Sequence, residues 1–310
     1  MKTRFKVVPY LLLFALPATV EAQFQFVTNN GAITITAYAG PGGAVTIPGT
    51  INGWPVTNIG DEAFWNCRNL SSVTIPSSVI CIGVEAFLGC YSLPSVTIPN
   101  SVTSIGDGAF AHCYSLTSVS IPNSVTNIGD VAFAGCSSLT NATIGNSVTS
   151  IGGSAFSFCT NLTSVTIGNS VTSIGSSTFW SCTSLAGVYF KSDAPTIGST
   201  AFFFAPNVTV YYLPGTTGWG STFGGVSTAP WFLPNPLILN KRPSFGVQSN
   251  RFGFTISWAT NLPVMVEACT NLSNQTWSPV GTNILICGCS YFSDPQWTNY
   301  PARFYRLRSP

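Results

Sequence analysis

The sequence predicts a repeat solenoid built from short parallel strands, followed by a small all-β domain that resembles a sandwich. Three observations predict this class. One 23-residue phrase recurs seven times, the phrase is lost after about residue 216, and charged residues make up only 6% of the 310-residue chain. An average soluble domain has roughly 25% charged residues. With so few charges in this chain, hydroxyl and amide side chains must keep its surface hydrated.

The first 22 residues have the form of an export signal. Lys2, Arg4 and Lys6 precede the apolar stretch 7–16, and small residues just before Gln23 allow cleavage there. An apolar run of about ten residues is too short to cross a bilayer, which takes about 20. We therefore expect a secreted or cell-surface protein with no membrane span after signal cleavage.

Charge argues against nucleic acid as a partner. Removing residues 1–22 takes away three basic residues and Glu21, which leaves eight Lys/Arg and eight Asp/Glu residues. A nearly neutral chain lacks the basic stripe that displaces counterions from a nucleic acid.

The repeat is defined by a few residue types at fixed spacing. An Ile-Gly pair recurs every 23 residues from Ile59 to Ile197, and phenylalanine recurs in step from Phe64 to Phe202. One cysteine column completes the pattern: Cys67, Cys90, Cys113, Cys136, Cys159 and Cys182, with Ala205 in the last unit.

Each unit contains two short extended segments. In L-x-S-V-T-I-P the apolar Val73 and Ile75 point inward, and the small polar Ser72 and Thr74 point outward. S-V-T-S-I-G forms the second extended run. The following A-F-x-x-C is expected to be a brief helical turn, capped by side chains such as Asp61. Stacked units would bury their Ile, Phe and Cys columns in one continuous core.

The unit V-x-x-I-G-x-x-A-F-x-x-C-x-x-L-x-x-V-x-I-P-x-S resembles the BspA-like leucine-rich repeats of bacterial and some protist surface proteins. The resemblance covers about residues 45–216. It implies a leucine-rich-repeat horseshoe in which the L-x-x-V-x-I strands form a parallel sheet on the concave face. With its caps, the solenoid would occupy residues 23–226.

The remainder of the chain has a different pattern. Residues 227–244 are rich in Pro and Trp and suggest a linker. Residues 245–310 contain short apolar runs separated by turn residues, which predicts a small antiparallel β domain. The phrase V-E-A-C-T-N-L…R-F-Y-R-L-R resembles a short C-terminal module of secreted bacterial proteins. That resemblance implies no activity, and packing, spacing and attachment all stay open as roles.

Metal chemistry is not expected from the cysteine column. Metal sites usually bring close cysteine pairs with histidine or acidic partners, and one cysteine every 23 residues lacks them. In the BspA-like repeats this slot packs inward, where a thiol acts as a small apolar group. We therefore expect a ladder of buried free thiols, although disulfides between stacked neighbours stay open in an oxidising compartment.

The C-terminal segment contains three cysteines, Cys269, Cys287 and Cys289. A bridge from Cys269 to either of the other two is an open possibility, and an odd number leaves at least one thiol without a local partner. No histidine or nearby carboxylate completes a metal shell around them.

Catalytic groups are scarce, so we expect no enzyme, no cofactor and no bound metal. His112 is the single histidine, and its slot varies from unit to unit, which indicates an exposed loop position. Asp61, Asp107 and Asp130 repeat at the same slot, where a capping role accounts for them. General acid–base work needs converging groups, and none are evident.

The outward columns of the expected concave sheet are the best candidates for ligand binding. Hydroxyl rows that end at tyrosines suit a neutral polar ligand, such as a glycan or an extended peptide of an extracellular protein. The plain alternative is that Ser and Thr simply suit an exposed strand, in which case the chain serves as a spacer or attachment protein. The candidate column is Thr74, Thr97, Ser120, Thr143, Thr166, Tyr189 and Tyr212.

Overall fold

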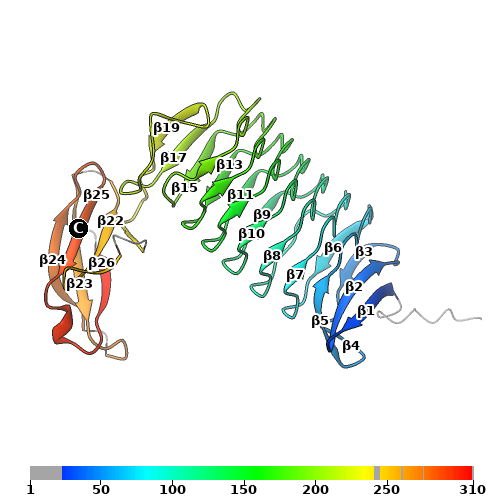
Figure 1. The fold of residues 1–310 in the computed structure, drawn as a ribbon, viewed down its shortest axis with the longest axis horizontal. Coiled ribbons are helices and arrows are strands. Elements are labelled where there is room, and N and C mark those ends of the chain that lie inside the picture. Colours follow the sequence, from blue (N-terminus) through cyan, green and yellow to red (C-terminus); the bar gives the residue numbers. More distant parts are fainter. Residues whose placement is uncertain (1–22, 241–244, 260, 275, 309–310) are drawn as a thin grey trace, which may run out of the picture.

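The computed structural model describes residues 23–240, 245–259, 261–274 and 276–308 (Figure 1). Residues 1–22, the predicted export signal, lie outside this described part. The solenoid begins at the N-terminal strands and ends beside a C-terminal β module (Figure 1). Its coils build two largely parallel sheets, which confirms the predicted repeat solenoid.

The first sheet is formed by the Ile-Gly segments, and we call it the Ile-Gly sheet. Its strands lie in the order β1-β2-β5-β7-β8-β10-β12-β14-β16, with β4 beside β5. Isoleucine pairs with isoleucine between coils, as Ile128 does with Ile105 and Ile151. The N-terminal strands are β1 (Phe24–Asn29), β2 (Ala32–Tyr38), β4 (Thr50–Ile51) and β5 (Trp54–Ile59). The repeat strands are β7 (Cys81–Ile82), β8 (Ser104–Ile105), β10 (Asn127–Ile128), β12 (Ser150–Ile151), β14 (Ser173–Ile174) and β16 (Thr196–Ile197).

The second sheet is formed by the x-V-x-I segments in the order β18-β19-β17-β15-β13-β11-β9. These strands are β9 (Ser118–Ser120), β11 (Asn141–Thr143), β13 (Ser164–Ile167), β15 (Gly187–Phe190), β17 (Thr209–Tyr212), β18 (Thr222–Phe223) and β19 (Val226–Pro230). The matching segments near the N-terminus, β3 (Gly43–Thr46) and β6 (Leu70–Thr74), pair separately. The coil between them and β9 has no assigned strand at residues 95–98.

A column of stacked phenylalanines fills the space between the two sheets. Phe133 is fully buried, and its ring centroid lies 5.3 Å from those of both Phe110 and Phe156, with the ring planes within 8° of parallel. Tyr38 extends the column into the N-terminal cap, 5.2 Å from Phe64. Large aromatic side chains bury much apolar area and gain further from stacking, so this column is the main core of the solenoid.

The predicted helical turns after Ile-Gly are wrong, because the A-F-x-x-C segments are chains of tight turns. Among the described residues the one named helix is the 3₁₀ turn η2 (Trp297–Asn299). Two residues of each segment, four positions apart, have left-handed backbone angles, as Glu62 does with a φ of 56° and Asn66 with a φ of 55°. The amides bond to the next coil, as Phe64 N–H does to the Ala86 carbonyl at 2.7 Å, so no i to i−4 helical ladder forms.

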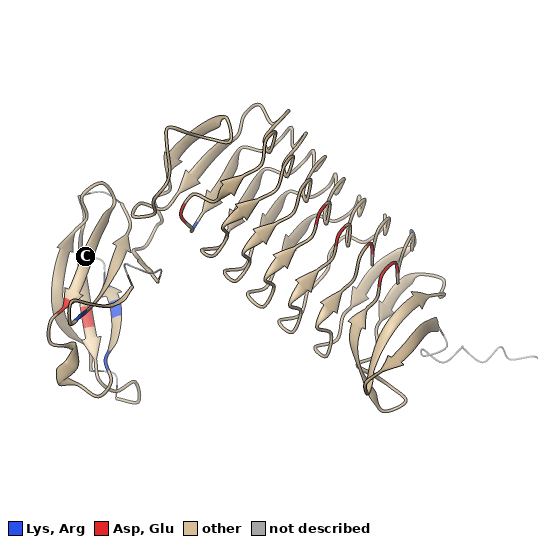
Figure 2. Cartoon of the chain, viewed as in Figure 1, with Lys and Arg blue, Asp and Glu red and all other residues tan. Residues whose placement is uncertain are grey.

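The capping role expected for the aspartates is wrong for the same reason. Asp61 Oδ1 accepts a hydrogen bond from the Val84 amide at 2.7 Å, and Asp107 Oδ1 accepts one from the Asp130 amide at 2.8 Å. Each carboxylate therefore ties its own coil to the next one. Figure 2 shows most of the acidic residues of the solenoid on the turns along one edge of the ribbon.

The C-terminal module is a small sandwich of antiparallel strands, as predicted. One sheet contains β20 (Leu237–Leu239), β21 (Gly246–Gln248), β22 (Arg251–Ser257) and β25 (Cys289–Asp294), with β22 at its centre. The other contains β24 (Ser278–Ile284), β23 (Pro263–Cys269) and β26 (Phe304–Arg308) in that order. Phe254, Ile256, Val264, Val266, Leu285 and Phe292 fill the core between them.

The segment predicted to be a linker, 227–244, contributes strands to both parts. β19 pairs with β17 of the solenoid, and β20 pairs with β22 of the module. The module also touches the last coil directly. A Cβ built at Gly215 would lie 2.9 Å from the Thr255 side chain and 3.2 Å from that of Cys289, so these two side chains pack closely on the Gly215 backbone.

Candidate ligand-binding surface

The seven-stranded sheet places a row of outward side chains at equivalent positions, and we call this row the hydroxyl column. Its strand register aligns Ser120, Thr143, Thr166 and Tyr189 in successive coils. Thr74 on β6 and Thr97 in the unassigned segment are also exposed. The structure therefore places six of the seven predicted residues outward, four of them in one continuous register.

Tyr212 does not belong to the hydroxyl column, which corrects the prediction. The last coil is one residue shorter than the others, because Gly187 pairs with Thr209. Tyr211 consequently pairs with Tyr189, and Tyr212 pairs with the buried Phe190. Ile197 and Phe202 still follow the 23-residue period, but the period continued into β17 is one residue out of register, and a one-residue shift moves a side chain to the other face of a sheet.

The hydroxyls of this column are free, in contrast with those of other threonine rows. Among the described residues, Ser120, Thr143 and Thr166 make no side-chain hydrogen bond within the chain. In the row that precedes each Ile-Gly strand, Thr126 Oγ1 donates to the Thr103 carbonyl at 3.3 Å and Thr149 Oγ1 donates to the Thr126 carbonyl at 3.1 Å. That row contributes to the stacking of coils, whereas the hydroxyl column leaves its donors and acceptors available.

The column ends in an aromatic cluster near the C-terminal end of the solenoid. The rings of Tyr189 and Tyr211 stack at 4.8 Å and 9°, and Trp231 lies 5.1 Å from Tyr189. A Cβ at Gly187 would lie 2.7 Å from the Tyr189 ring, so only glycine at that position lets the ring lie across the neighbouring column. Because the two tyrosine rings cover each other, they offer edges and hydroxyls to a ligand rather than an open face between them.

An open groove lies on the Ile-Gly sheet. Its volume is about 360 Å³, and Asp107, Asp130, Asn127 and Ser150 are among its lining residues. Gly153 leaves the groove open, because this slot holds a side chain in the other coils. Asp130 Oδ1 already accepts a hydrogen bond from the Gly153 amide at 2.6 Å, so one oxygen of this carboxylate serves the stacking of coils.

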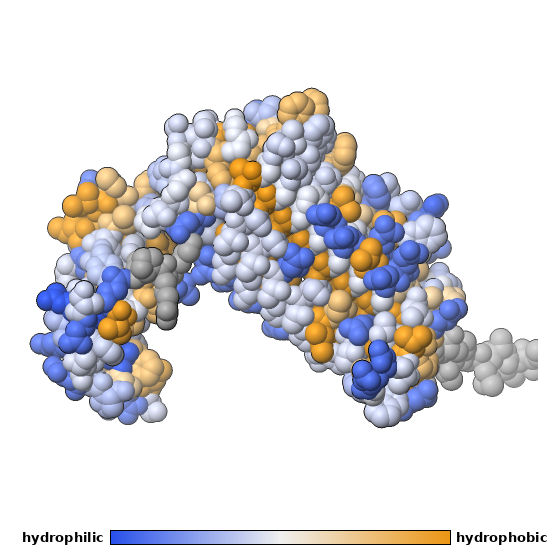
Figure 3. Space-filling view, in the orientation of Figure 1, coloured by the Kyte–Doolittle hydropathy of each residue, from blue (hydrophilic) through white to orange (hydrophobic). Residues whose placement is uncertain are grey.

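A cluster of exposed aromatic rings, missed by the sequence analysis, lies on the turns of the last coils. Phe158, Phe203 and Phe204 have exposed fractions of 55%, 49% and 59%, and Trp180 stacks on Phe203 at 4.9 Å. Phe158 and Phe204 have positive φ at a slot that holds Gly89 and Gly135 in other coils. The sequence signal for this cluster was a phenylalanine at a repeat position that holds glycine in other coils. Figure 3 shows patches of apolar residues among the weakly polar residues on the surface of the solenoid.

The cysteine column lies inside the solenoid as free thiols. Five of its six members are buried and Cys67 is half-buried. The Cys136 thiol donates to the Phe110 carbonyl at 3.2 Å, and the Cys182 thiol donates to the Phe156 carbonyl at 3.1 Å. Burial raises the pKa of Cys113 and of Cys182 to about 12, so these thiols stay protonated and poorly reactive at neutral pH.

The C-terminal cysteines are also free in the structure, and Cys269 lies away from the other two. Cys269 ends β23, whereas Ile284 pairs with Pro263 at the start of that strand. Cys287 and Cys289 follow Ile284 and therefore lie about 20 Å from Cys269 along the sheet. A disulfide needs Cα atoms within about 7 Å. Among the described residues, no group of three His, Cys, Asp or Glu side chains could hold a metal ion.

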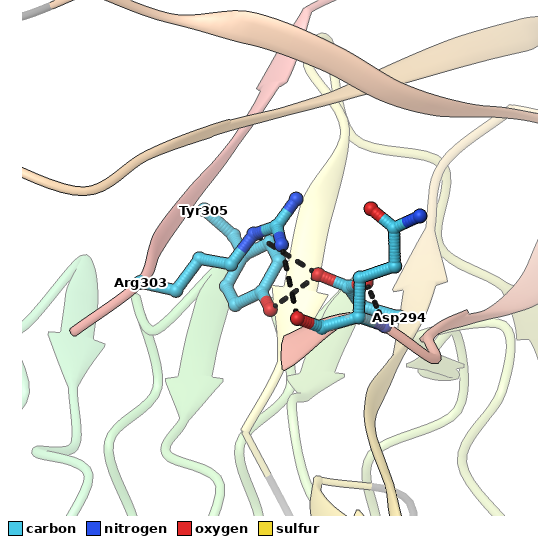
Figure 4. Close-up of polar contacts among 4 residues, drawn as sticks. Asp294, Arg303 and Tyr305 are labelled. Atoms are coloured by element: carbon cyan, nitrogen blue, oxygen red, sulfur yellow. Dashed lines mark hydrogen bonds and ion pairs between the residues drawn. The ribbon is translucent and has the colours of Figure 1, made fainter. Parts of the chain in front are cut away.

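Buried charges in the C-terminal module are paired and hold its last strand. Asp294 accepts a hydrogen bond from the Tyr305 hydroxyl at 2.9 Å and forms an ion pair with Arg303 at 3.1 Å (Figure 4). Glu267 pairs with Arg306 at 2.7 Å, and this hydrogen bond lowers the pKa of the Glu267 carboxyl. Burial, followed by the contact with Asp294, raises the pKa of Tyr305. Each group faces its partner rather than a cleft.

His112 lies on an exposed turn, edge-on to Tyr114 with ring centroids 5.7 Å apart. Its backbone φ of 58° belongs to the same left-handed slot as that of Asn66. Its placement therefore follows from turn geometry, and its side chain makes no hydrogen bond among the described residues.

The fold and the repeated site define the class: a leucine-rich-repeat solenoid carrying a small β sandwich. The profile of the "BspA type Leucine rich repeat region" matches in six copies over residues 57–186 and 105–219, more than half of the chain. The protein therefore belongs to the BspA-type leucine-rich-repeat family.

Solved structures share the repeat region. The T. pallidum leucine-rich repeat protein is 34% identical with a TM-score of 0.58, and the match covers 60% of this chain and 88% of that one. A leucine-rich cell surface protein from Faecalibacterium prausnitzii is 28% identical with a TM-score of 0.37, over 61% of this chain and 74% of that one. A search of curated proteins finds no significant match. No helix in the described residues is long and apolar enough to span a membrane.

Proposed function

We propose that the protein is a secreted or cell-surface, non-catalytic binding module. In this proposal the outward face of the seven-stranded sheet recognises an extracellular protein or a carbohydrate. The observation that carries it is the contrast between threonine rows: one row is engaged in stacking the coils, while Ser120, Thr143 and Thr166 keep their hydroxyls free. The expectation that this face is concave stays a prediction.

The geometry favours an extended, neutral, polar ligand. Adjacent strands of a sheet lie about 4.8 Å apart, so the free hydroxyls form a regular row of donors and acceptors. The row ends at Tyr189 and Tyr211, whose stacked rings are half-buried and leave their edges at the surface. The stacked rings are preorganised and lose little conformational entropy on binding. No charged side chain lies in the hydroxyl column, which favours a neutral partner.

Binding of the purified mature chain to glycan and protein arrays tests this proposal. Tyr189→Ala and Tyr211→Ala are expected to weaken the recovered ligand by about tenfold or more, as loss of a central aromatic contact does. Thr143→Val should weaken binding without changing stability. Its matched control is Thr126→Val, which removes an engaged hydroxyl and should lower stability while leaving the affinity of the folded chain unchanged. No ligand, or one insensitive to all three column variants, contradicts the proposal.

The alternative is a structural spacer or attachment protein without a specific ligand. The near-identity of successive coils favours it, because a specific site usually breaks repeat symmetry. Cell fractionation of a chain truncated after Ser244 separates the two ideas. An attachment role for the C-terminal module predicts release of the truncated chain, whereas unchanged localisation argues against that role.

A further inference from the structure

The ten cysteines fall into distinct environments. The ladder thiols from Cys90 to Cys182 are buried and donate hydrogen bonds to phenylalanine carbonyls. Cys287, in contrast, is the exposed cysteine of the described residues, and Cys289 is half-buried two positions further on. The reactivity of a thiol depends on its access to solvent as well as on its ionisation. Cys287 and Cys289 are more accessible than the ladder thiols and are therefore better placed for thiol–disulfide exchange.

Backbone geometry keeps Cys287 and Cys289 within bonding reach of each other. Ile286 and Cys289 form an antiparallel bridge, and Cys287 and Gly288 are the two central residues of the turn, with φ of 53° and 82°. Two positions of extended chain span about 7 Å at most, and a tight turn brings them closer. Disulfides form between Cα atoms 4.4–6.8 Å apart. No other cysteine shares this turn, because Cys269 lies at the far end of β23.

The same turn lies against the last coil of the solenoid. A Cβ at Gly288 would lie 2.8 Å from both Pro214 and Phe232, and Cys289 approaches Gly215. Ile286, which precedes Cys287 in the turn, is apolar and 72% exposed. The cysteine pair is therefore located where the C-terminal module meets the solenoid, with Cys287 exposed and Cys289 half-buried.

We propose that Cys287 and Cys289 are a reversible dithiol–disulfide pair that exchanges with low-molecular-weight disulfides. The Cys287 thiolate attacks one sulfur of the small disulfide, forms a mixed disulfide and releases one small thiolate. The Cys289 thiolate then attacks the Cys287 sulfur, closes the Cys287–Cys289 bond and releases the second small thiolate. The protein loses two protons and two electrons, and the small disulfide is reduced to two thiols.

Mass spectrometry of the full mature chain tests this pair. The reduced chain is incubated with oxidised glutathione, quenched with acid and digested with trypsin, which leaves all three C-terminal cysteines in the peptide 252–303. In Cys269→Ser, that peptide is expected to lose two hydrogens and to recover them in dithiothreitol. If Cys269→Ser does not fold, chymotryptic digestion of the unmodified chain at Trp277 separates Cys269 from the pair.

Single variants identify the order of attack. In Cys289→Ser, the reaction should stop at one glutathione adduct on Cys287, while in Cys287→Ser adduct formation at Cys289 should be slower because that thiol is half-buried. The ladder thiols, with Cys136 as the internal reference, should stay unmodified under the same conditions. The proposal is overturned if the native pair accumulates a stable glutathione adduct or a dimer instead of losing two hydrogens, or if it reacts no faster than Cys136.

Discussion

The solenoid and the C-terminal module are stabilised in opposite ways. In the solenoid one set of contacts repeats from coil to coil: Ile on Ile, Phe on Phe, thiol on carbonyl. In the module the decisive contacts are unique, and all three ion pairs described in the structure fix β26 or its approach. Each coil of the solenoid contacts its neighbours through the same repeated set of contacts, whereas each ion pair of the module occurs once. The two regions should therefore respond differently to single substitutions and to acid.

Phe133→Ala should produce the largest effect. Phe133 is fully buried and stacks on both neighbours at 5.3 Å, so its removal leaves a cavity in the middle of the column. Substitutions of this kind cost about 3–5 kcal/mol. Denaturant unfolding of the solenoid measures the change. Phe202→Ala is the matched control, because Phe202 ends the column with one stacked neighbour, Phe179; an equal loss in both variants would contradict a cooperative stack.

Acid should weaken the module by protonating the carboxylate of Glu267, which pairs with Arg306. Arg306 lowers the pKa of Glu267 in the folded state, so the contribution of this pair to stability is present above the unfolded pKa near 4.3 and is lost as pH falls through the lower folded value. Far-UV and tryptophan signals followed from pH 6 to about pH 2 should show this loss in the module. Glu267→Gln should reduce it, whereas Asp107→Asn in the solenoid should not; equal pH profiles for all three chains would contradict the assignment.

Phe158→Gly should stabilise the solenoid slightly. Phe158 has a φ of 57° at a slot where Gly135 has 72°, and a bulky residue in this region carries about 1–3 kcal/mol of strain. The entropy that glycine adds to the unfolded chain offsets part of that gain, so we expect an increase of about 1 kcal/mol. Ser157→Gly, one position earlier and at a normal φ, is the control and should not stabilise. A loss of stability in Phe158→Gly would mean that the exposed ring contributes packing.

The residues that repeat are those that the sequence could predict. The period placed Ile128 and Phe133 in the core because every coil must bury the same face. It placed Tyr212 wrongly, because a 22-residue coil gives no sign of its missing residue except in the pairing of Gly187 with Thr209. The helical turn was wrong because the propensity of A-F-x-x-C is outweighed by hydrogen bonds to the next coil.

Whether a given threonine hydroxyl is hydrogen-bonded within the chain or free could not be predicted from the sequence. Thr126 and Thr143 are both exposed threonines in extended segments, and the sequence offers no means of telling them apart. Thr126 reaches the carbonyl of the previous coil, and Thr143 does not. That distinction depends on where each strand lies relative to its neighbour, which only the assembled coils determine.

Pro94→Thr tests the one interruption in the repeated pattern and should have the smallest effect. Successive coils are joined here by Thr140 N–H to the Thr117 carbonyl at 2.9 Å and by Thr117 N–H to the Pro94 carbonyl at 3.0 Å. Proline has no N–H, so the series stops at position 94, and residues 95–98 make no backbone hydrogen bond within the described part of the chain.

The substitution gives this coil a donor directed at the coil before it. A new hydrogen bond contributes about 0.5–1.5 kcal/mol, and loss of proline returns about 0.4–1 kcal/mol of entropy to the unfolded chain, so stability should change by less than about 1 kcal/mol. Hydrogen exchange is the sensitive measurement: amides 95–98 should become slower to exchange as the gap between β6 and β9 closes. Pro99→Thr, beyond the end of the segment, should leave them unchanged. Unaltered exchange in Pro94→Thr would show that the spacing of the coils, rather than the missing amide, keeps the sheet divided.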